Sequence, residues 1–146
     1  MKDWDNTLTG KLLIHAENPD SIGYRDNRWY FPDIPGYDKN QIGIGLDKRF
    51  TPGLLEAIKL DDKGLPYITE QDEHNLRYQK IKEANDAANR RYKYAQQAVN
   101  RPKGTISAVK DAAVVSAIYN LGATYVANTL FEDKDFMLNL FDGTDK

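Results

Sequence analysis

The sequence contains no cysteine, so disulfide frameworks, thiolate metal sites and cysteine nucleophiles are excluded. Its two histidines, His15 and His74, do not form the closely spaced pair of a zinc hydrolase. No apolar run reaches the roughly 18 residues of a membrane-spanning helix. The N-terminus also lacks the apolar core of a signal peptide. We therefore expect no metal and no membrane insertion.

An excess of positive charge is also missing, because 20 Lys and Arg residues face 22 Asp and Glu residues, for a net charge of −2. This balance disfavours nucleic-acid binding through a basic surface. Hydrophobic residues make up 40% of the chain and charged residues 29%, which is ordinary for a globular protein. The 146 residues suit one domain, or two small lobes that share a long element.

Helical periodicity is clearest in two segments. Leucines and alanines at helical spacing predict a helix over residues 8–17, which Asn18-Pro19 ends because a residue before proline avoids the helical conformation. Residues 69–100 contain neither glycine nor proline, and they begin with Thr69 as a capping residue followed by acidic residues. Further helices are predicted over residues 51–60, 107–121 and 133–141.

Residues 20–47 are rich in glycine, proline and aromatic residues, which predicts short antiparallel strands and turns. We therefore predict an α+β fold. Residues 1–68 would form a lobe with an N-terminal helix and a small sheet, residues 69–100 a connecting helix, and residues 101–146 a helical lobe. A functional site is expected in the cleft between the two lobes.

Two carboxylic residues frame the start of the predicted sheet. Glu17 ends the first helix, and Asp26 follows after eight residues. Hydrolysis of a glycosidic bond needs an acid that protonates the leaving oxygen and a second group that acts on water. A helix end that faces a strand can hold two carboxyl groups about 6.5–9.5 Å apart, as an inverting enzyme requires.

These residues resemble a motif of the phage-type lysozymes. Glu17, Tyr24 and Asp26 match the family's glutamate, tyrosine and aspartate in type and spacing. A glycine-containing strand follows in both. The resemblance covers roughly residues 8–142, and its further matches, in the family's order, are residues 42–45, 68–72, 111–123 and 128–130.

The resemblance implies a lysozyme-like fold and a muramidase that needs no cofactor. Such an enzyme hydrolyses peptidoglycan glycan strands between N-acetylmuramic acid and N-acetylglucosamine, with inversion. Glu17 would be the general acid, kept protonated by partial desolvation, and ionised Asp26 would activate water. The domain would act on the bacterial cell wall as an endolysin, a virion-associated lysin or a toxin domain. A holin, a virion or a secretion system would deliver it, in the last two cases as part of a larger protein.

The sequence departs from the family at several positions. Gln41 replaces the threonine that helps to hold the attacking water, and Leu46 replaces a histidine and precedes Asp47. The interval between Asp26 and Gln41 is also longer than in the family. The chain stops where the family has one or two more helices, so it is either truncated or a shortened member.

Several residues carry two interpretations. Gln41 either positions water or packs in the strand, and Asp47 is a substitute candidate for the base. Trp29 and Tyr30 either stack on sugar rings or pack the insertion onto the sheet. Tyr24 either contacts substrate or packs on the sheet.

Two other functions remain open at this stage. One is a catalytically inactive lysozyme-like virion or baseplate component that binds glycan or protein; Gln41, Leu46 and the short C-terminus favour it. The other is a lytic transglycosylase, which can work with a single glutamate and leaves anhydro-muramic ends.

Overall fold

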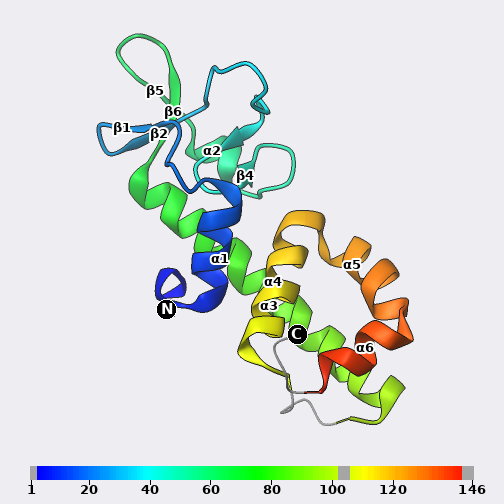
Figure 1. The fold of residues 1–146 in the computed structure, drawn as a ribbon. Coiled ribbons are helices and arrows are strands. Elements are labelled where there is room, and N and C mark those ends of the chain that lie inside the picture. The colour runs from blue at the N-terminus through cyan, green and yellow to red at the C-terminus, as the bar shows by residue number, and fades with distance from the viewer. Residues whose placement is uncertain (1–2, 102–105, 143–146) are drawn as a thin grey trace. The chain divides into compact units, whose positions relative to one another are not determined.

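The structure is a computed structural model that describes residues 3–101 and 106–142. It combines six α-helices among the described residues with short antiparallel strands (Figure 1). This composition agrees with the predicted α+β class. The predicted first helix is α1 (Leu8–Glu17), with the predicted boundaries, and Glu17 is its last residue.

The chain divides into two compact units, which are described separately. The sheet unit consists of residues 13–80, and the helical unit consists of residues 1–12 together with residues 81–146. Two helices, α1 and α3 (Glu70–Val99), contribute residues to both units. All of the candidate site residues predicted from the sequence belong to the sheet unit.

The sheet unit holds two small antiparallel sheets. The larger has the strand order β1-β2-β6-β5, and the smaller pairs β3 with β4. The strand bounds are β1 Tyr24–Arg25, β2 Arg28–Tyr30, β3 Gln41–Ile42, β4 Leu46–Asp47, β5 Lys59–Leu60 and β6 Pro66–Thr69. The single sheet predicted over residues 20–47 is therefore divided: β1 and β2 pair with strands from residues 59–69, whereas β3 and β4 form a sheet of their own.

A cluster of buried apolar side chains packs within this unit. Burial of one such side chain contributes about 1.5–3 kcal/mol, whereas an isolated two-stranded sheet is marginal in water. The cluster draws on both sheets and on α2, so it stabilises them together. Its members are Trp29, Ile42, Ile44, Leu46, Leu54 and Ile68.

The helix predicted over residues 51–60 is wrong for most of its length. Helix α2 covers only Leu54–Ala57, and its N-cap is Gly53, with a φ of 86°, rather than Thr51, the first residue of the predicted helix. The Thr51 hydroxyl instead accepts a hydrogen bond from a backbone amide of β4. Lys59–Leu60 forms strand β5 and pairs with β6. A short helix is only marginally stable alone, so strand pairing decides the conformation of this segment.

Helix α3 follows its predicted limits closely. The Thr69 hydroxyl accepts a hydrogen bond from the Asp72 backbone amide at 3.0 Å and caps the helix. Acidic side chains in the first turn face the positive end of the helix dipole. Asn100, with a φ of 54°, ends the helix. Most of its buried apolar side chains recur every three or four residues, at Tyr78, Ile81, Ala84, Ala88, Tyr92 and Ala95, and Ala87 beside them is also buried.

The helical unit contains short helices besides its share of α3. Helix α4 (Ala108–Leu121) lies within its predicted range of residues 107–121; it starts at the Ser107 cap and ends at Gly122, and α6 (Lys134–Leu140) starts at the Asp133 cap. Three further elements had not been predicted from the sequence: η1 (Trp4–Asn6), α5 (Ala123–Thr129) and η3 (Leu130–Glu132).

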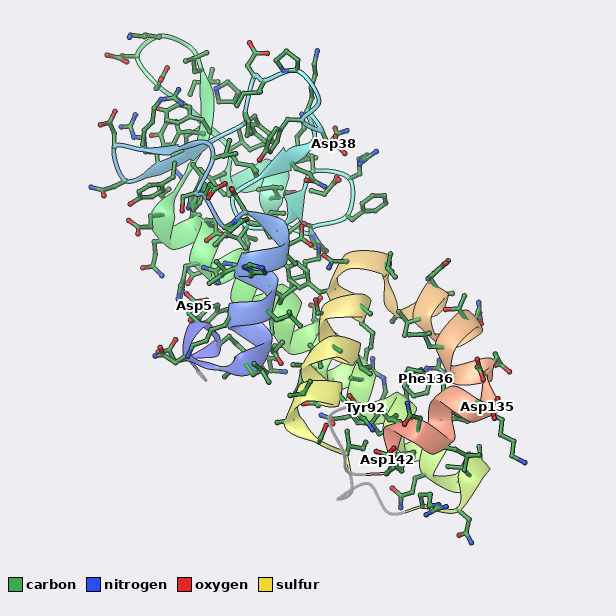
Figure 2. The ribbon with its side chains drawn as sticks, viewed as in Figure 1. Asp5, Asp38, Tyr92, Asp135, Phe136 and Asp142 are labelled. Carbon is green, nitrogen blue, oxygen red and sulfur yellow. The ribbon has the colours of Figure 1, made fainter. Side chains whose placement is uncertain are left out.

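Aromatic packing organises the core of the helical unit. The Phe131 ring lies 6.3 Å from the Tyr92 ring and 5.5 Å from the Phe136 ring, measured between centroids. The Tyr92 hydroxyl donates a hydrogen bond of 2.7 Å to Asp111 of α4. Figure 2 labels Tyr92 and Phe136 in this core. Burial and the neighbouring carboxylate raise the pKa of Tyr92, so its hydroxyl remains protonated and can donate.

Candidate active site

The end of α1 is fixed to the β3–β4 connection by a buried amide. The Asn18 side chain donates hydrogen bonds of 3.0 Å to the carbonyl oxygens of Ile22 and Gly43, and its own oxygen accepts one from the Ile22 amide. Asn18 is 6% exposed, so these bonds are shielded from water. Glu17, the preceding residue, is thereby held at a defined position.

The β3–β4 connection, residues 43–45, is called the glycine turn here. Gly43 and Gly45 have φ values of 65° and 71°, which side chains rarely adopt. A Cβ atom on Gly45 would lie 3.0 Å from the Glu17 Oε2 atom, and one on Gly43 would lie 2.6 Å from the Glu73 Cγ atom. The two glycines therefore let two glutamate side chains pack against the same backbone turn.

The glycine turn also rests on a buried ion pair. The Glu73 Oε2 atom accepts a hydrogen bond of 3.2 Å from the Ile44 amide. The same carboxylate accepts hydrogen bonds of 3.0 Å from Arg77 Nε and 3.1 Å from Arg77 Nη2. The side chains of Glu73 and Arg77 are 2% and 5% exposed. A charge buried this deeply is tolerated only when it is paired and hydrogen-bonded.

Removing one member of this pair should destabilise the protein strongly. We expect Glu73→Ala to lower the free energy of unfolding by about 3–5 kcal/mol, because it leaves the Arg77 charge without its bidentate partner. Chemical denaturation monitored by circular dichroism measures the loss.

Asp86→Ala is the matched control for this prediction. Lys82 and Asp86 form an exposed pair on the same helix with the same spacing of four residues, at 2.9 Å. Its removal should cost less than about 0.5 kcal/mol. Equal losses in the two variants would show that the Glu73–Arg77 pair does not anchor the glycine turn.

Lys80 also reaches the glycine turn from α3. Its Nζ atom donates a long hydrogen bond of 3.4 Å to the Gly45 carbonyl oxygen. Burial lowers the pKa of the Lys80 ammonium, and the nearby carboxylates of Glu17 and Asp47 oppose this shift. The lysine therefore adds a positive charge beside Glu17.

Asp47, the substitute candidate for the base, is engaged elsewhere. It is 6% exposed, and its two carboxylate oxygens accept hydrogen bonds from Arg49 at 3.1 and 2.8 Å. These bonds hold the pKa of Asp47 below its usual value, against the effect of burial. Arg49 also forms an ion pair of 3.0 Å with Asp38, which lies in the loop between β2 and β3. Figure 2 labels Asp38. Asp47 thus serves the loop structure and is a poor candidate for activating water.

Asp26 lies at the tip of the β1–β2 hairpin. Asp26 and Asn27 have φ values of 55° and 60°, and Arg25 pairs with Arg28 across them. Two residues with positive φ between paired strands form the type I′ turn of tight hairpins. Asp26 is exposed, so its carboxylate is accessible to a ligand. Its hairpin is distinct from the glycine turn on which Glu17 packs.

Gln41 and Tyr24 flank these two turns. Gln41 is exposed on β3, next to buried Ile42, so its side chain does not pack in the interior of the sheet unit. The Tyr24 hydroxyl lies 3.2 Å from Asn27 and 3.1 Å from Glu70. Tyr24 is therefore tied to its own hairpin and to the start of α3, which favours a structural role.

The two predicted sugar-stacking residues lie inside the sheet unit. Trp29 is 5% exposed and its ring centroid is 5.0 Å from that of Tyr24. Tyr30 is 6% exposed. The Arg25 guanidinium carbon lies 3.6 Å from the centroid of the Tyr30 ring, and the Tyr67 ring centroid lies 5.7 Å from it. Rings covered in this way offer no free face to a sugar. The structure favours the packing interpretation for both.

Sequence reasoning missed the three charged residues of α3 at the glycine turn. Glu73, Arg77 and Lys80 recur every three or four residues, and this spacing continues into the buried stripe at Ile81 and Ala84. Charged residues on the inward face of an amphipathic helix are the signal that identifies such positions. Glu73 had been read only as part of the acidic first turn.

Comparisons with protein families, with curated proteins and with solved structures find no match for this chain. Across residues 3–101 and 106–142, no group of three or more His, Cys, Asp or Glu side chains is placed to hold a metal ion. Within the same residues, none of the helices is both long and apolar enough to cross a membrane.

Proposed function

We propose that this chain is a muramidase of lysozyme-like fold that hydrolyses the glycan strands of bacterial peptidoglycan. The observation that carries the proposal is the position of Glu17. It is the last residue of α1, is half-buried, and packs against the glycine turn between β3 and β4. A partly desolvated glutamic acid at a fixed position is what protonation of a glycosidic oxygen requires.

In the proposed reaction, Glu17 transfers its proton to the glycosidic oxygen as the bond to the anomeric carbon breaks. Water attacks the opposite face of the sugar and gives a proton to Asp26, the accessible carboxylate of the β1–β2 hairpin. Exposed Gln41, on the strand that leads into the glycine turn, holds this water through its side-chain amide. The product is inverted at the anomeric carbon, and no cofactor takes part.

The partner of this site is the glycan strand, and the place of action is the bacterial cell wall. Delivery by a holin, a virion or a secretion system is part of the proposal, as is attachment to a larger virion or toxin protein. The sheet unit holds every residue named in the reaction.

Purified sacculi provide the test. Incubation with the chain should release fragments with reducing N-acetylmuramic acid ends, each heavier by one water than an anhydro product, as detected by mass spectrometry. Anhydro-muramic ends would identify a lytic transglycosylase instead. Binding to sacculi without release of fragments would identify an inactive lysozyme-like component.

A further inference from the structure

Several charged side chains lie around the glycine turn. Arg77 donates hydrogen bonds to the carboxylate of Glu73, and Arg49 donates hydrogen bonds to both carboxylate oxygens of Asp47. Glu17 from α1 and Lys80 from α3 also reach this turn.

Lys80 and Glu17 both approach Gly45. The Lys80 Nζ atom lies 3.4 Å from the Gly45 carbonyl oxygen. The Glu17 Oε2 atom lies 3.0 Å from the position that a Cβ atom would take if Gly45 carried a side chain. Lys80 is half-buried, so water screens its charge less than at the surface. The carboxylates of Glu17 and Asp47 both favour the charged form of Lys80.

We propose that Lys80 is a positioning residue for Glu17, and that its ammonium restricts glycoside cleavage to acidic pH. The second part rests on the proposed function. A nearby cation favours the ionised form of a carboxyl group, whereas a general acid must carry its proton. Lys80 therefore opposes the effect of desolvation on Glu17. The glutamic acid able to donate a proton is most abundant at low pH.

A carbon-13 NMR titration of the Glu17 carboxyl group tests the pairing without any substrate. The resonance is assigned by its absence from Glu17→Gln. In Lys80→Met, which keeps the apolar stem and removes the charge, the titration midpoint should rise by about one pH unit. Lys80→Arg keeps the charge and should restore the wild-type midpoint. Lys80→Gln replaces Lys80→Met if the latter does not fold.

Lys82→Met is the matched control. Lys82 lies two residues further along the same helix, where side chains point to a different face, and it pairs with Asp86 at 2.9 Å. Its loss should leave the Glu17 midpoint unchanged. The upper limb of the pH profile of kcat/KM should move to higher pH in Lys80→Met, by the same interval as the midpoint.

The outcomes separate the two proposals. An equal Glu17 midpoint in Lys80→Met and Lys82→Met overturns the role of Lys80, whatever the activity of the chain. A midpoint that moves while sacculi release no fragments supports the Lys80–Glu17 pairing and overturns the hydrolase function. A midpoint that moves together with the activity profile supports both.

Discussion

Glu17→Gln should reduce the release of glycan fragments to a trace, because loss of the general acid lowers the rate by about 10²–10⁴-fold. The amide keeps the size of the side chain and its packing against Gly45, but it cannot donate an acidic proton. The rate of sacculus hydrolysis, measured by the appearance of reducing ends, gives the effect. Circular dichroism and thermal unfolding should show an intact fold.

Glu56→Gln is the control for this substitution. Glu56 is an exposed glutamate on α2 in the same sheet unit, so the same chemical change is made away from the glycine turn. Its rate should match the wild type. If folded Glu17→Gln keeps more than a few per cent of the wild-type rate, Glu17 is not the acid.

Asp26→Asn should lower kcat by about 10²–10⁴-fold and leave KM nearly unchanged, because activation of water is needed only in the transition state. The hairpin should survive, since asparagine tolerates the positive φ of 55° at this position as well as aspartate does. Steady-state kinetics on soluble glycan fragments separate kcat from KM.

Asp33→Asn makes the same change at an exposed aspartate of the loop that follows β2, and it should be neutral. A raised KM with an unchanged kcat in Asp26→Asn would make Asp26 a contact residue. In that case the proposed role in water activation would fail.

Local signals predicted most helix limits correctly. Thr69, the predicted cap, starts α3, and α4 lies within its predicted range of residues 107–121, because capping involves hydrogen bonds over only three or four residues. Asn18-Pro19 ended α1 at Glu17 for a similarly local reason. The position of Glu17 at a helix end was therefore available from the sequence.

Strand pairing was harder to predict from the sequence than the ends of helices. The segment at residues 51–60 carried a plausible helix start, but Lys59–Leu60 pairs with Pro66–Thr69 as β5 and β6. The same limit applies to Trp29 and Tyr30. Their aromatic side chains fit an exposed platform and a packed sheet equally well in sequence. Only their burial in the folded unit, Trp29 beside Tyr24 and Tyr30 beneath Arg25, distinguishes the two interpretations.

The sequence by itself determined the ends of α1, α3 and α4 and placed Glu17 at a helix terminus, since these depend on neighbouring residues. Only the tertiary structure decided which charges meet at the glycine turn. Glu73 reaches Ile44 across 29 positions of sequence, and Lys80 reaches Gly45 across 35. No periodicity within one element specifies contacts of that range. They depend on how the glycine turn packs on α3, where Gly43 and Gly45 leave room for two carboxylates.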